Sequence, residues 1–351
     1  MSRVERDFKA STEIALSAPE KVLSRLCAHF REFGEVTGQG RCRRIETGFG
    51  TADIEALDTC LRVCAAGKDE VALAFVKLAL AENLLTFADE SPQIVWHGDG
   101  AEGAPLPYFR EMRVERVANI TPNMRRVTFS GDNLVRFATG GLHVRLLIPR
   151  DAANKPVWPV MGADGRPKWP CGEDQHDVRI YTLRRVDAEQ SEVDIDFVMH
   201  EGADMPGANF AANALPGDVV GMTGPGGGCV PDADWCLLAG DETALPAIAR
   251  ILEELPASSR AVVRIEVQNE AEIQPLRSNA QIDVQWLFRD HALPMSLPVA
   301  LMAVDWPLGN GSVFAWVGCE YRDFLRVRRY LRNERHLKRE EHLAVAYWRR
   351  I

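Results

Sequence analysis

Apolar residues recur at helical spacing in two stretches of the first hundred residues, 22–33 and 69–83. The first stretch follows Ser17-Ala-Pro-Glu20, which has the order of a capping box with proline just inside the helix start. Strand-like runs are expected at three further places, residues 42–47, 51–56 and 93–96. Two helices beside a few strands predict a small α+β domain over residues 1–97.

Residues 98–109 are rich in glycine and proline and lack periodicity, which is typical of a linker. From residue 110 the pattern alternates or is β-branched. Five strands are predicted, at residues 113–118, 126–129, 143–148, 179–184 and 193–198. Short strands separated by turns favour an antiparallel β-barrel over 110–232. Residues 151–177, with four prolines and two tryptophans, are predicted to form a surface loop.

Strands and helices alternate after residue 232. Strands are predicted at residues 235–239, 261–267, 282–288 and 312–317, and helices at residues 244–255 and 321–335. This alternation implies a parallel, doubly wound sheet, so residues 233–351 are expected to form an α/β domain. The predicted fold is therefore multi-domain, with a small α+β domain, an antiparallel barrel and an α/β parallel-sheet domain.

Composition narrows the classes of protein. The 351 residues are 46% hydrophobic and 26% charged, and no apolar run is long enough to cross a membrane. The charged start lacks a signal-peptide pattern, so we expect a cytoplasmic protein without membrane insertion. The net charge of −9 argues against nucleic-acid binding.

The charge of the last thirty-two residues and the spacing of the cysteines also bear on function. Residues 320–351 hold ten Arg or Lys against five Asp or Glu, so they form either a solvated helix face or a site for an anionic ligand. The eight cysteines are scattered, and the spacing of Cys60 and Cys64 suits one helix or turn, not a metal site.

The hexapeptide Arg179-Ile-Tyr-Thr-Leu-Arg184 combines three side chains that a ligand could use. On a strand, Arg179 and Tyr181 point to one face and Thr182 points to the other. They offer a guanidinium for phosphate, an aromatic face for stacking and a hydroxyl for a ring nitrogen. The alternative is an ordinary barrel strand with surface charge.

Two further segments could hold phosphates. A turn at residues 199–211 precedes the glycine-rich run 224–228, whose backbone amides would be exposed if it leads into a helix. Residues 238–248 read as strand, glycine turn and helix with Pro246 in the first turn, which suits a dinucleotide although it is not GxGxxG. Glycines also form plain turns, so neither segment is specific alone.

In this order the segments resemble the siderophore-interacting proteins, a family of ferredoxin-reductase-like flavoproteins. The motifs that carry the resemblance are His143–Pro149, Arg179–Arg184, Asp196–His200, Pro216–Asp218, Gly240–Ile248, Trp316–Glu320 and Ala346–Arg349. Residues 1–97 resemble a small domain of unknown function that is sometimes fused to this family. The chain departs from the family pattern at the Met205–Ala211 turn, at Gly226 (commonly arginine) and at Cys319 (commonly glycine).

The resemblance implies a role for each matching residue. Arg179 would bind the flavin phosphates, Tyr181 would lie against the isoalloxazine ring, and Thr182 would lie near its N5. Further contacts to FAD would come from His200, Pro206, Gly207, Ala208, Phe210 and Ala211. A nicotinamide donor would meet Asp241, Glu242, Thr243 and Ala244. Arg145 and Arg349 are the candidate side chains for an anionic ferric complex.

The resemblance further implies an FAD-binding barrel, an NAD(P)-binding-like α/β domain and the reduction of ferric siderophores to release Fe(II). Electrons would come from NADH, NADPH or a ferredoxin, and the flavin would perform the redox chemistry. Two alternatives stay open: a general flavin or ferredoxin-type reductase, and a non-catalytic protein that binds ferric siderophores.

Overall fold

The computed structural model describes residues 7–151, 155–199, 205–309 and 311–350. Its contacts divide the chain into two compact units. Unit 1 contains residues 1–109 together with residues 153–175, and unit 2 contains residues 110–152 and 176–351. Each unit is described by itself.

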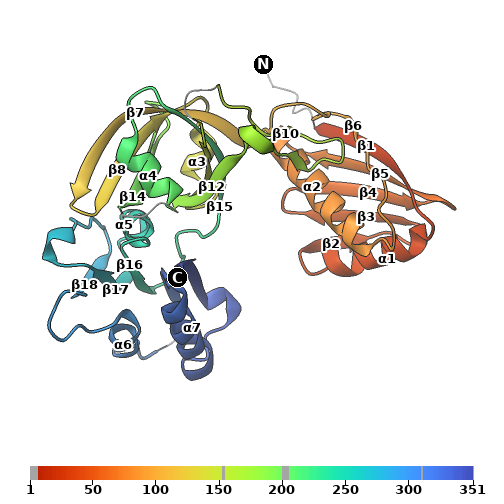
Figure 1. The fold of residues 1–351 in the computed structure, drawn as a ribbon. Helices are drawn as coiled ribbons and strands as arrows, with labels where there is room; N and C mark the ends of the chain where they lie inside the picture. Colours follow the sequence, from red (N-terminus) through yellow and green to blue (C-terminus); the bar gives the residue numbers. More distant parts are fainter. Residues whose placement is uncertain (1–6, 152–154, 200–204, 310, 351) are drawn as a thin grey trace, which may run out of the picture. The chain divides into compact units, whose positions relative to one another are not determined.

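Unit 1 is an antiparallel sheet whose one face is covered by two helices (Figure 1). Its elements are β1 (Phe8–Ala15), α1 (Pro19–Phe30), β2 (Gly34–Thr37), β3 (Cys42–Thr47), β4 (Gly50–Ala56), β5 (Cys60–Gly67), α2 (Glu70–Phe87) and β6 (His97–Gly98). The strand order is β2-β3-β4-β5-β1-β6. Inward and outward side chains alternate along β1 and β5, so only one face of the sheet contributes to the core.

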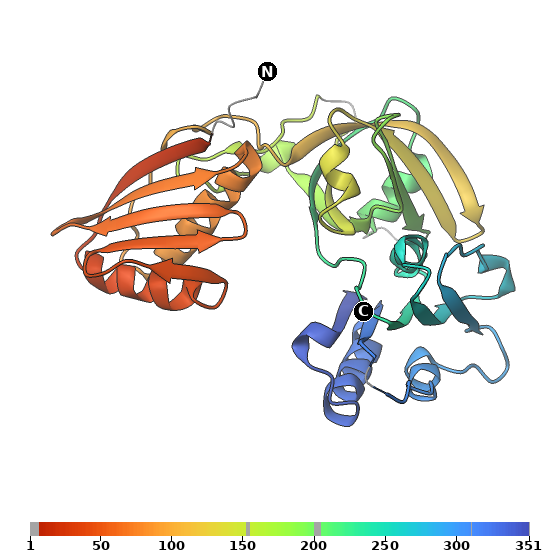
Figure 2. The ribbon, with the colours of Figure 1, turned by 180° about the vertical axis from the view of Figure 1, so that it is seen from behind.

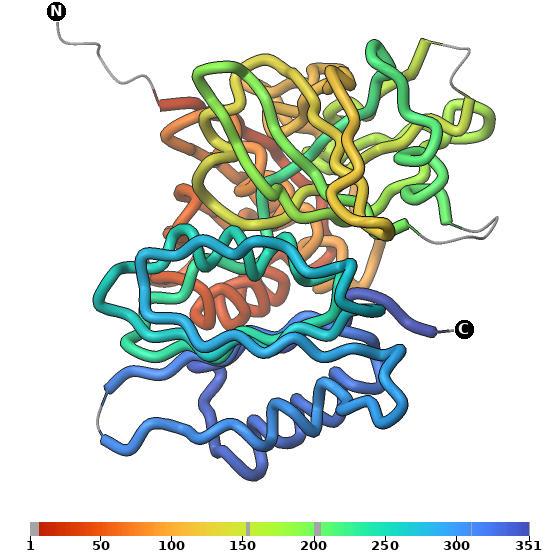
Figure 3. Tube along the Cα trace, turned by 90° about the vertical axis from the view of Figure 1, so that its left-hand side faces the viewer, coloured from red at the N-terminus to blue at the C-terminus, as the bar shows by residue number. Residues whose placement is uncertain are grey.

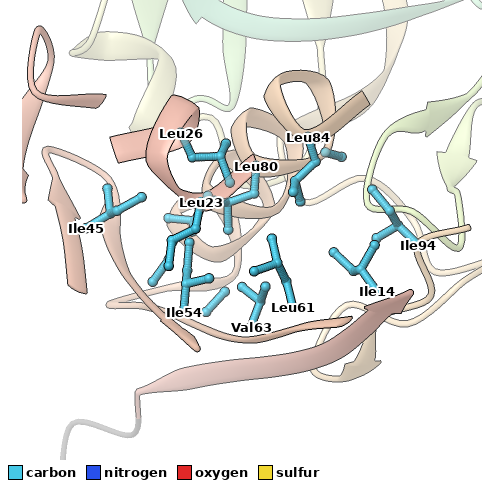
Figure 4. Close-up of a cluster of buried hydrophobic side chains, with 14 of the residues drawn as sticks. Ile14, Leu23, Leu26, Ile45, Ile54, Leu61, Val63, Leu80, Leu84 and Ile94 are labelled. Atoms are coloured by element: carbon cyan, nitrogen blue, oxygen red, sulfur yellow. The ribbon is translucent and has the colours of Figure 1, made fainter. Parts of the chain in front are cut away.

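The core of unit 1 is aliphatic. Figure 4 shows Ile54, Leu61 and Val63 of the strands facing Leu23 and Leu80 of the helices, and all five are almost fully buried. Burial of such side chains contributes about 1.5–3 kcal/mol each. This arrangement confirms the two predicted helices.

Three local expectations in unit 1 are wrong. α1 is capped by Ala18 without a side-chain bond, and Ser17 instead donates from its backbone N and Oγ to Glu90 Oε1, at 2.7 and 2.9 Å. Cys60 and Cys64 lie on strand β5, where the alternation of the intervening residues was the better signal. The closing strand is not 93–96 but the two-residue β6.

The expected surface loop is partly ordered by packing within unit 1. It forms the short hairpin β10 (Val160–Met161) and β11 (Pro167–Lys168), followed by the 3-10 turn η1 (Gly172–Asp174). Met161 is buried with Leu106 and Tyr108, which come from the glycine- and proline-rich segment 98–109. Trp96 donates from its backbone N to Ala163 O at 3.0 Å. Apolar anchors therefore order segments whose composition predicts a linker and a loop.

Unit 2 begins with a seven-stranded antiparallel sheet, ordered β12-β9-β15-β7-β8-β14-β13. Its elements are β7 (Phe109–Thr121), β8 (Met124–Ser130), α3 (Val135–Ala138), β9 (His143–Pro149), β12 (His176–Thr182), β13 (Arg185–Asp187), β14 (Glu192–Val198), α4 (Pro206–Asn213) and β15 (Val219–Gly226). The glycine-rich run at residues 224–228 ends β15 and leads to another strand, not to a helix. The expectation of a phosphate-binding helix start at that run is wrong.

A five-stranded parallel sheet completes unit 2, in the order β18-β17-β16-β19-β20. Its elements are β16 (Trp235–Asp241), α5 (Leu245–Glu254), β17 (Arg260–Val267), η2 (Glu270–Glu272), β18 (Gln281–Phe288), α6 (Leu297–Met302), β19 (Val313–Glu320), α7 (Tyr321–Arg329), the π-turn η3 (Tyr330–Glu334), η4 (Arg339–Glu341) and β20 (His342–Trp348). The parallel sheet is confirmed. α6 and β20 were not predicted.

Helices cover both faces of this sheet. α5 packs on one face, while α6 and α7 pack on the other, so every residue of β16 is buried. α5 lies between the barrel and the sheet (Figure 2), and Arg250 on it donates to the carbonyls of Leu183 and Ala138 at 3.1 Å each. Figure 3 shows the segments after β15, in teal to blue, as a separate layer beside the barrel segments of unit 2.

No helix within the described ranges is both long and apolar enough to cross a membrane.

Candidate cofactor and donor site

Tyr181 lies at the end of β12, an edge strand of the barrel. Its ring centroid is 4.4 Å from that of Phe197, and its hydroxyl fits against Gly207 at the start of α4. A Cβ atom at residue 207 would lie 1.7 Å from Tyr181 Oη, so this approach requires glycine. Burial raises the pKa of Tyr181 to about 12, although the nearby charge of Arg179 opposes the shift. The side chain is therefore a neutral phenol held between the strand and the helix.

The start of α4 is suited to an anion. Pro206 occupies its first turn, and Met205 at the N-cap forms no side-chain hydrogen bond to the amides of the helix. Uncapped amides and the helix dipole favour a phosphate at such a position. Ala208 and Ala211 of α4 are buried. The Phe210 ring is nearly parallel to that of Phe129, with ring centroids 6.2 Å apart. These small residues therefore allow α4 to pack closely against the barrel core.

Arg179 is exposed on β12, two residues before Tyr181, which contacts the start of α4. Its Nη1 donates to its neighbour's carbonyl, Val178 O, at 2.9 Å. Among the described residues no carboxylate pairs with it, whereas Arg126 and Arg185 on nearby strands are held by carboxylates. Its charge therefore remains available for phosphate. His200, the other predicted contact in this region, lies outside the described residues.

Thr182 is buried beside a tyrosine from the other end of unit 2. It is the cross-strand partner of His143 on β9, so both side chains project to the same face. Tyr347 on β20 places its hydroxyl 2.5 Å from His143 Nε2. The His143 Nδ1 is 2.7 Å from Gly227 O. The barrel and the parallel sheet are thus joined by partly buried polar contacts.

The four residues predicted to meet the donor lie around the end of β16. The Asp241 side chain accepts hydrogen bonds from Trp348 Nε1 at 2.7 Å and from Thr243 N at 3.0 Å. Burial raises the pKa of Asp241 to about 6, against the effect of these bonds. Ala244 is fully buried against Gly240 and serves packing.

Glu242 is engaged by a residue from another strand. Arg289, which follows β18, donates to both of its carboxylate oxygens at 2.8 and 2.6 Å. Arg289 also lies 3.5 Å from Glu266 on β17. The hydrogen bonds and the two carboxylates raise the pKa of Arg289, although its burial acts most strongly in the opposite direction. The Glu242 side chain therefore reaches a ligand only as part of this ion pair.

A cavity of about 800 Å³ opens at the carboxyl edge of the parallel sheet. It is lined by Asn123, Val198, Met199, Asp241, Glu242, Glu266, Gln268, Arg289, Leu297, Cys319, Glu320, Arg322, Asp323, Trp348 and Arg350. The carboxyl ends of parallel strands are where α/β sheets bind ligands. Asp241 and Glu242 therefore line a cavity at the edge where α/β sheets bind ligands.

The two candidate siderophore-binding residues have different surroundings. Arg145 is exposed on β9 beside Ile180 and Thr223 of the neighbouring strands, and no described carboxylate pairs with it. Arg349 lies with its guanidinium 5.0 Å from the ring of Tyr321. A cation–π contact of this kind leaves the positive charge exposed.

Several residues of the site were missed by sequence reasoning. His143 and Tyr347 were present in the matched motifs but received no role, and Trp348 and Arg289 were not singled out. The apolar run at 343–348 directly after a helix was the signal for β20. Nothing in the local sequence around Arg289 indicates its pairing with Glu242.

An antiparallel barrel followed by a parallel α/β sheet, with a cavity at the sheet's carboxyl edge, defines a ferredoxin-reductase-like flavoprotein. Two family models divide this part of the chain: "Siderophore-interacting FAD-binding domain" matches residues 113–229, and "Siderophore-interacting protein" matches residues 233–351. An uncharacterized family conserved in bacteria, DUF2218, matches residues 11–97.

Individual proteins agree with these matches. The ferric vibriobactin reductase ViuB of Vibrio cholerae is 34% identical over 250 residues, covering 69% of this chain and 90% of that protein. The NADPH-dependent ferric-chelate reductase of Escherichia coli is 31% identical, covering 58% and 83%. The solved siderophore utilization protein from T. fusca is 35% identical with a TM-score of 0.60, covering 69% and 93%. The chain belongs to the siderophore-interacting protein family and carries its FAD-binding domain.

Proposed function

We propose that this protein is an FAD-dependent reductase that reduces ferric iron in a siderophore and so releases Fe(II). The observation that carries the proposal is the fit of Tyr181 against Gly207 at the start of α4, on the same strand as Arg179, with which no described carboxylate pairs. A helix start, an aromatic ring and a cation at the end of β12 are the groups that a flavin nucleotide needs, and they support the proposal. The named reductases among the relatives support the same activity.

FAD, when bound, would supply the redox chemistry, namely transfer of the two electrons of a hydride from NAD(P)H to two ferric ions with release of one proton. Fe(II) binds hard oxygen ligands less strongly than Fe(III) because its charge is lower, so the metal leaves the siderophore. The chain's own residues need only bind, orient and shield these reactants.

We assign FAD binding to residues 110–232. The α4 amides of Gly207 and Ala208, together with Arg179, would hold the phosphates. Tyr181 would lie against the isoalloxazine ring, with Thr182 near N5. Pro206, Phe210 and Ala211 would belong to the helix that lies along FAD. His200 would be a further contact to FAD.

We assign donor binding to residues 233–351. The 800 Å³ cavity bordered by Asp241 and Glu242 would receive NADH or NADPH, and the turn through Thr243 and Ala244 would fix its edge. We also propose that a ferredoxin can serve as the donor, because α7 exposes four arginines that suit a small acidic protein, namely Arg322, Arg326, Arg328 and Arg329.

We propose that Arg145 and Arg349 attract the anionic ferric complex. Both guanidinium groups are exposed and neither forms an ion pair within the described part of the chain. Their charges therefore remain uncompensated, which raises the rate of encounter with an anion.

The test is anaerobic. FAD-loaded protein is reduced with NADPH and mixed with a ferric catecholate siderophore, and flavin absorbance is followed together with capture of Fe(II) by a chelator. We expect reoxidation of the flavin with two Fe(II) per flavin. Arg145→Gln should slow the reoxidation of the flavin. Arg260→Gln should not, because Arg260 lies at the amino end of β17, away from the cavity at the carboxyl edge of the sheet.

Each alternative has its own result in this assay. Rapid reduction of free flavin with indifference to the siderophore would indicate a general flavin reductase. Protein that binds the siderophore but takes up no FAD would indicate a binding protein and would refute the proposed activity.

A further inference from the structure

One end of the cavity at the carboxyl edge of the parallel sheet is formed by a cluster of three charged side chains, Glu242, Glu266 and Arg289. Arg289 donates to both carboxylate oxygens of Glu242 at 2.8 and 2.6 Å and lies 3.5 Å from Glu266 Oε1. The other oxygen of Glu266, Oε2, accepts from Leu297 N at 3.0 Å. Two carboxylates share one guanidinium, so this Arg289 cluster keeps a net negative charge.

The Arg289 cluster is largely shielded from water. The exposed fractions of the side chains are 14% for Glu242, 15% for Glu266 and 27% for Arg289. Charges at such depth are screened less by water and salt than surface charges are. A doubly negative group that entered this end of the cavity would therefore meet two carboxylates, and the one guanidinium there is already engaged by both.

The proposed function indicates which part of a nicotinamide donor would reach this cluster. Tyr347 on β20 contacts His143, the cross-strand partner of Thr182, and Thr182 is assigned a place near flavin N5. The nicotinamide must reach N5, so it would lie toward β19 and β20. The sheet order β18-β17-β16-β19-β20 puts the Arg289 cluster on the other side of β16, where the adenosine half of the donor would lie.

We propose that Glu242 and Glu266 select NADH over NADPH as the electron donor. In dinucleotide-binding α/β folds a carboxylate beyond the second strand accepts from the adenosine ribose 2′-hydroxyl, whereas an arginine accommodates a 2′-phosphate. Glu266 lies near the end of β17, the second strand of the β16–α5–β17 unit, and its Oε1 can accept from that hydroxyl. The 2′-phosphate of NADPH would instead face both carboxylates, because the charge of Arg289 is compensated.

This inference rests on the proposed function, which puts a nicotinamide donor in the cavity. Resemblance alone would not predict the choice, since the relative from Escherichia coli is named NADPH-dependent. The other arginines that line the cavity, Arg322 and Arg350, follow β19 and β20, on the opposite side of β16 from the cluster. The phosphates that NADH and NADPH share do not distinguish the two nucleotides, so selectivity depends on the Arg289 cluster.

The test compares kcat/KM for NADH and NADPH in the whole FAD-loaded protein, with ferricyanide as the final electron acceptor. We expect NADH to be favoured at least about tenfold, with NADPH still a donor at high concentration. Glu266→Gln removes one charge at nearly constant size and should shift the ratio about tenfold toward NADPH. Asp283→Asn is the matched control, because it removes the same charge from an exposed pair with Arg264 in the amino half of β18. It should leave the ratio unchanged.

A second measurement reports on the adenosine end alone, without electron transfer. AMP and its 2′-phosphorylated form compete with the donor, and AMP should bind more tightly to the wild type. Glu242→Gln combined with Glu266→Gln should reverse this order, because Arg289 then has no carboxylate partner in the cluster and can bind phosphate. Adding Arg289→Gln should abolish the reversal, which general damage to the fold would not explain.

Each outcome decides between the inference and the proposed function. Wild-type protein that uses NADPH as well as NADH, or a ratio that Glu266→Gln leaves unchanged, would overturn this inference and leave the proposed function standing. An equal shift in Asp283→Asn would trace the effect to net charge and would also overturn it. Bound FAD that neither nucleotide reduces would refute the nicotinamide donor of the proposed function together with this inference.

Discussion

Replacing Gly207 with alanine sets helix propensity against packing at one position. Alanine is favoured over glycine within a helix by about 1 kcal/mol, so the sequence alone predicts a more stable α4. In the structure the added Cβ would lie 1.7 Å from Tyr181 Oη and 2.8 Å from Cζ. Overpacking of this degree costs about 3 kcal/mol because ring and helix must separate. We expect a net loss of about 2 kcal/mol.

The same displacement should weaken FAD binding. Moving the start of α4 away from Tyr181 separates the amides from the ring, and a loss of about 1.4 kcal/mol raises Kd tenfold. Urea unfolding of the flavin-free protein gives the stability, and quenching of flavin fluorescence on titration gives the affinity. Gly48→Ala is the matched control, because its Cβ would meet nothing within 4 Å.

A double-mutant cycle identifies the hydroxyl as the cause. Tyr181→Phe removes the atom at 1.7 Å and leaves Cζ at 2.8 Å, a gap that small shifts can relieve. Gly207→Ala should therefore cost about 1.5 kcal/mol less in the Tyr181→Phe background than in the wild type. Gly207→Ala protein that is more stable than wild type and binds FAD equally well would refute the reasoning.

Three further outcomes are expected. The pKa of Asp241 rises from 3.8 to about 6 in the folded protein, so the folded state binds a proton at higher pH than the unfolded chain does, and stability should increase by up to about 3 kcal/mol as pH falls from 7.5 to 4. Urea unfolding across this pH range should show no such increase for Asp241→Asn. The same dependence of stability on pH in Asp241→Asn and wild type would contradict the assignment. Arg126→Ala leaves the buried Asp196 carboxylate, bonded at 2.6 and 2.8 Å, without its partner and should cost about 3–5 kcal/mol, while Glu13→Gln in the exposed pair with Arg62 should not change the unfolding midpoint measurably. Arg179→Gln should raise the Kd for FAD and make this Kd less dependent on salt concentration, because one charge is lost. A salt dependence equal to that of the wild type would contradict a contact between Arg179 and the phosphates.

Local patterns predicted the elements whose burial is set by their own periodicity. The β16 run is apolar on both faces, as a central parallel strand must be. The alternation in β9 and β14 predicted antiparallel strands, although most residues of both strands are buried. The strand β20 was not predicted, because its alternation is weak and it is only half buried. The capping box at Ser17 failed because a distant carboxylate, Glu90, competes for the same donors.

The candidate site was predicted unevenly for the same reason. The motifs around Arg179, Tyr181 and Asp241 are continuous in sequence, so resemblance to the family sufficed to find them. Arg289 could not be found, because its role depends on β18 lying two strands from β16, which brings it to Glu242.

The sequence by itself determined the order of the barrel and the α/β sheet and the family motifs, because these follow from side-chain periodicity and from short continuous patterns. Only the tertiary structure decided that Tyr347 meets His143, 204 residues away, that Gly207 admits the Tyr181 hydroxyl, and that the hairpin around Met161 packs in unit 1. Such contacts depend on which strands become neighbours and how closely their backbones approach. Periodicity fixes the face to which a side chain points, but not the partner that it finds there.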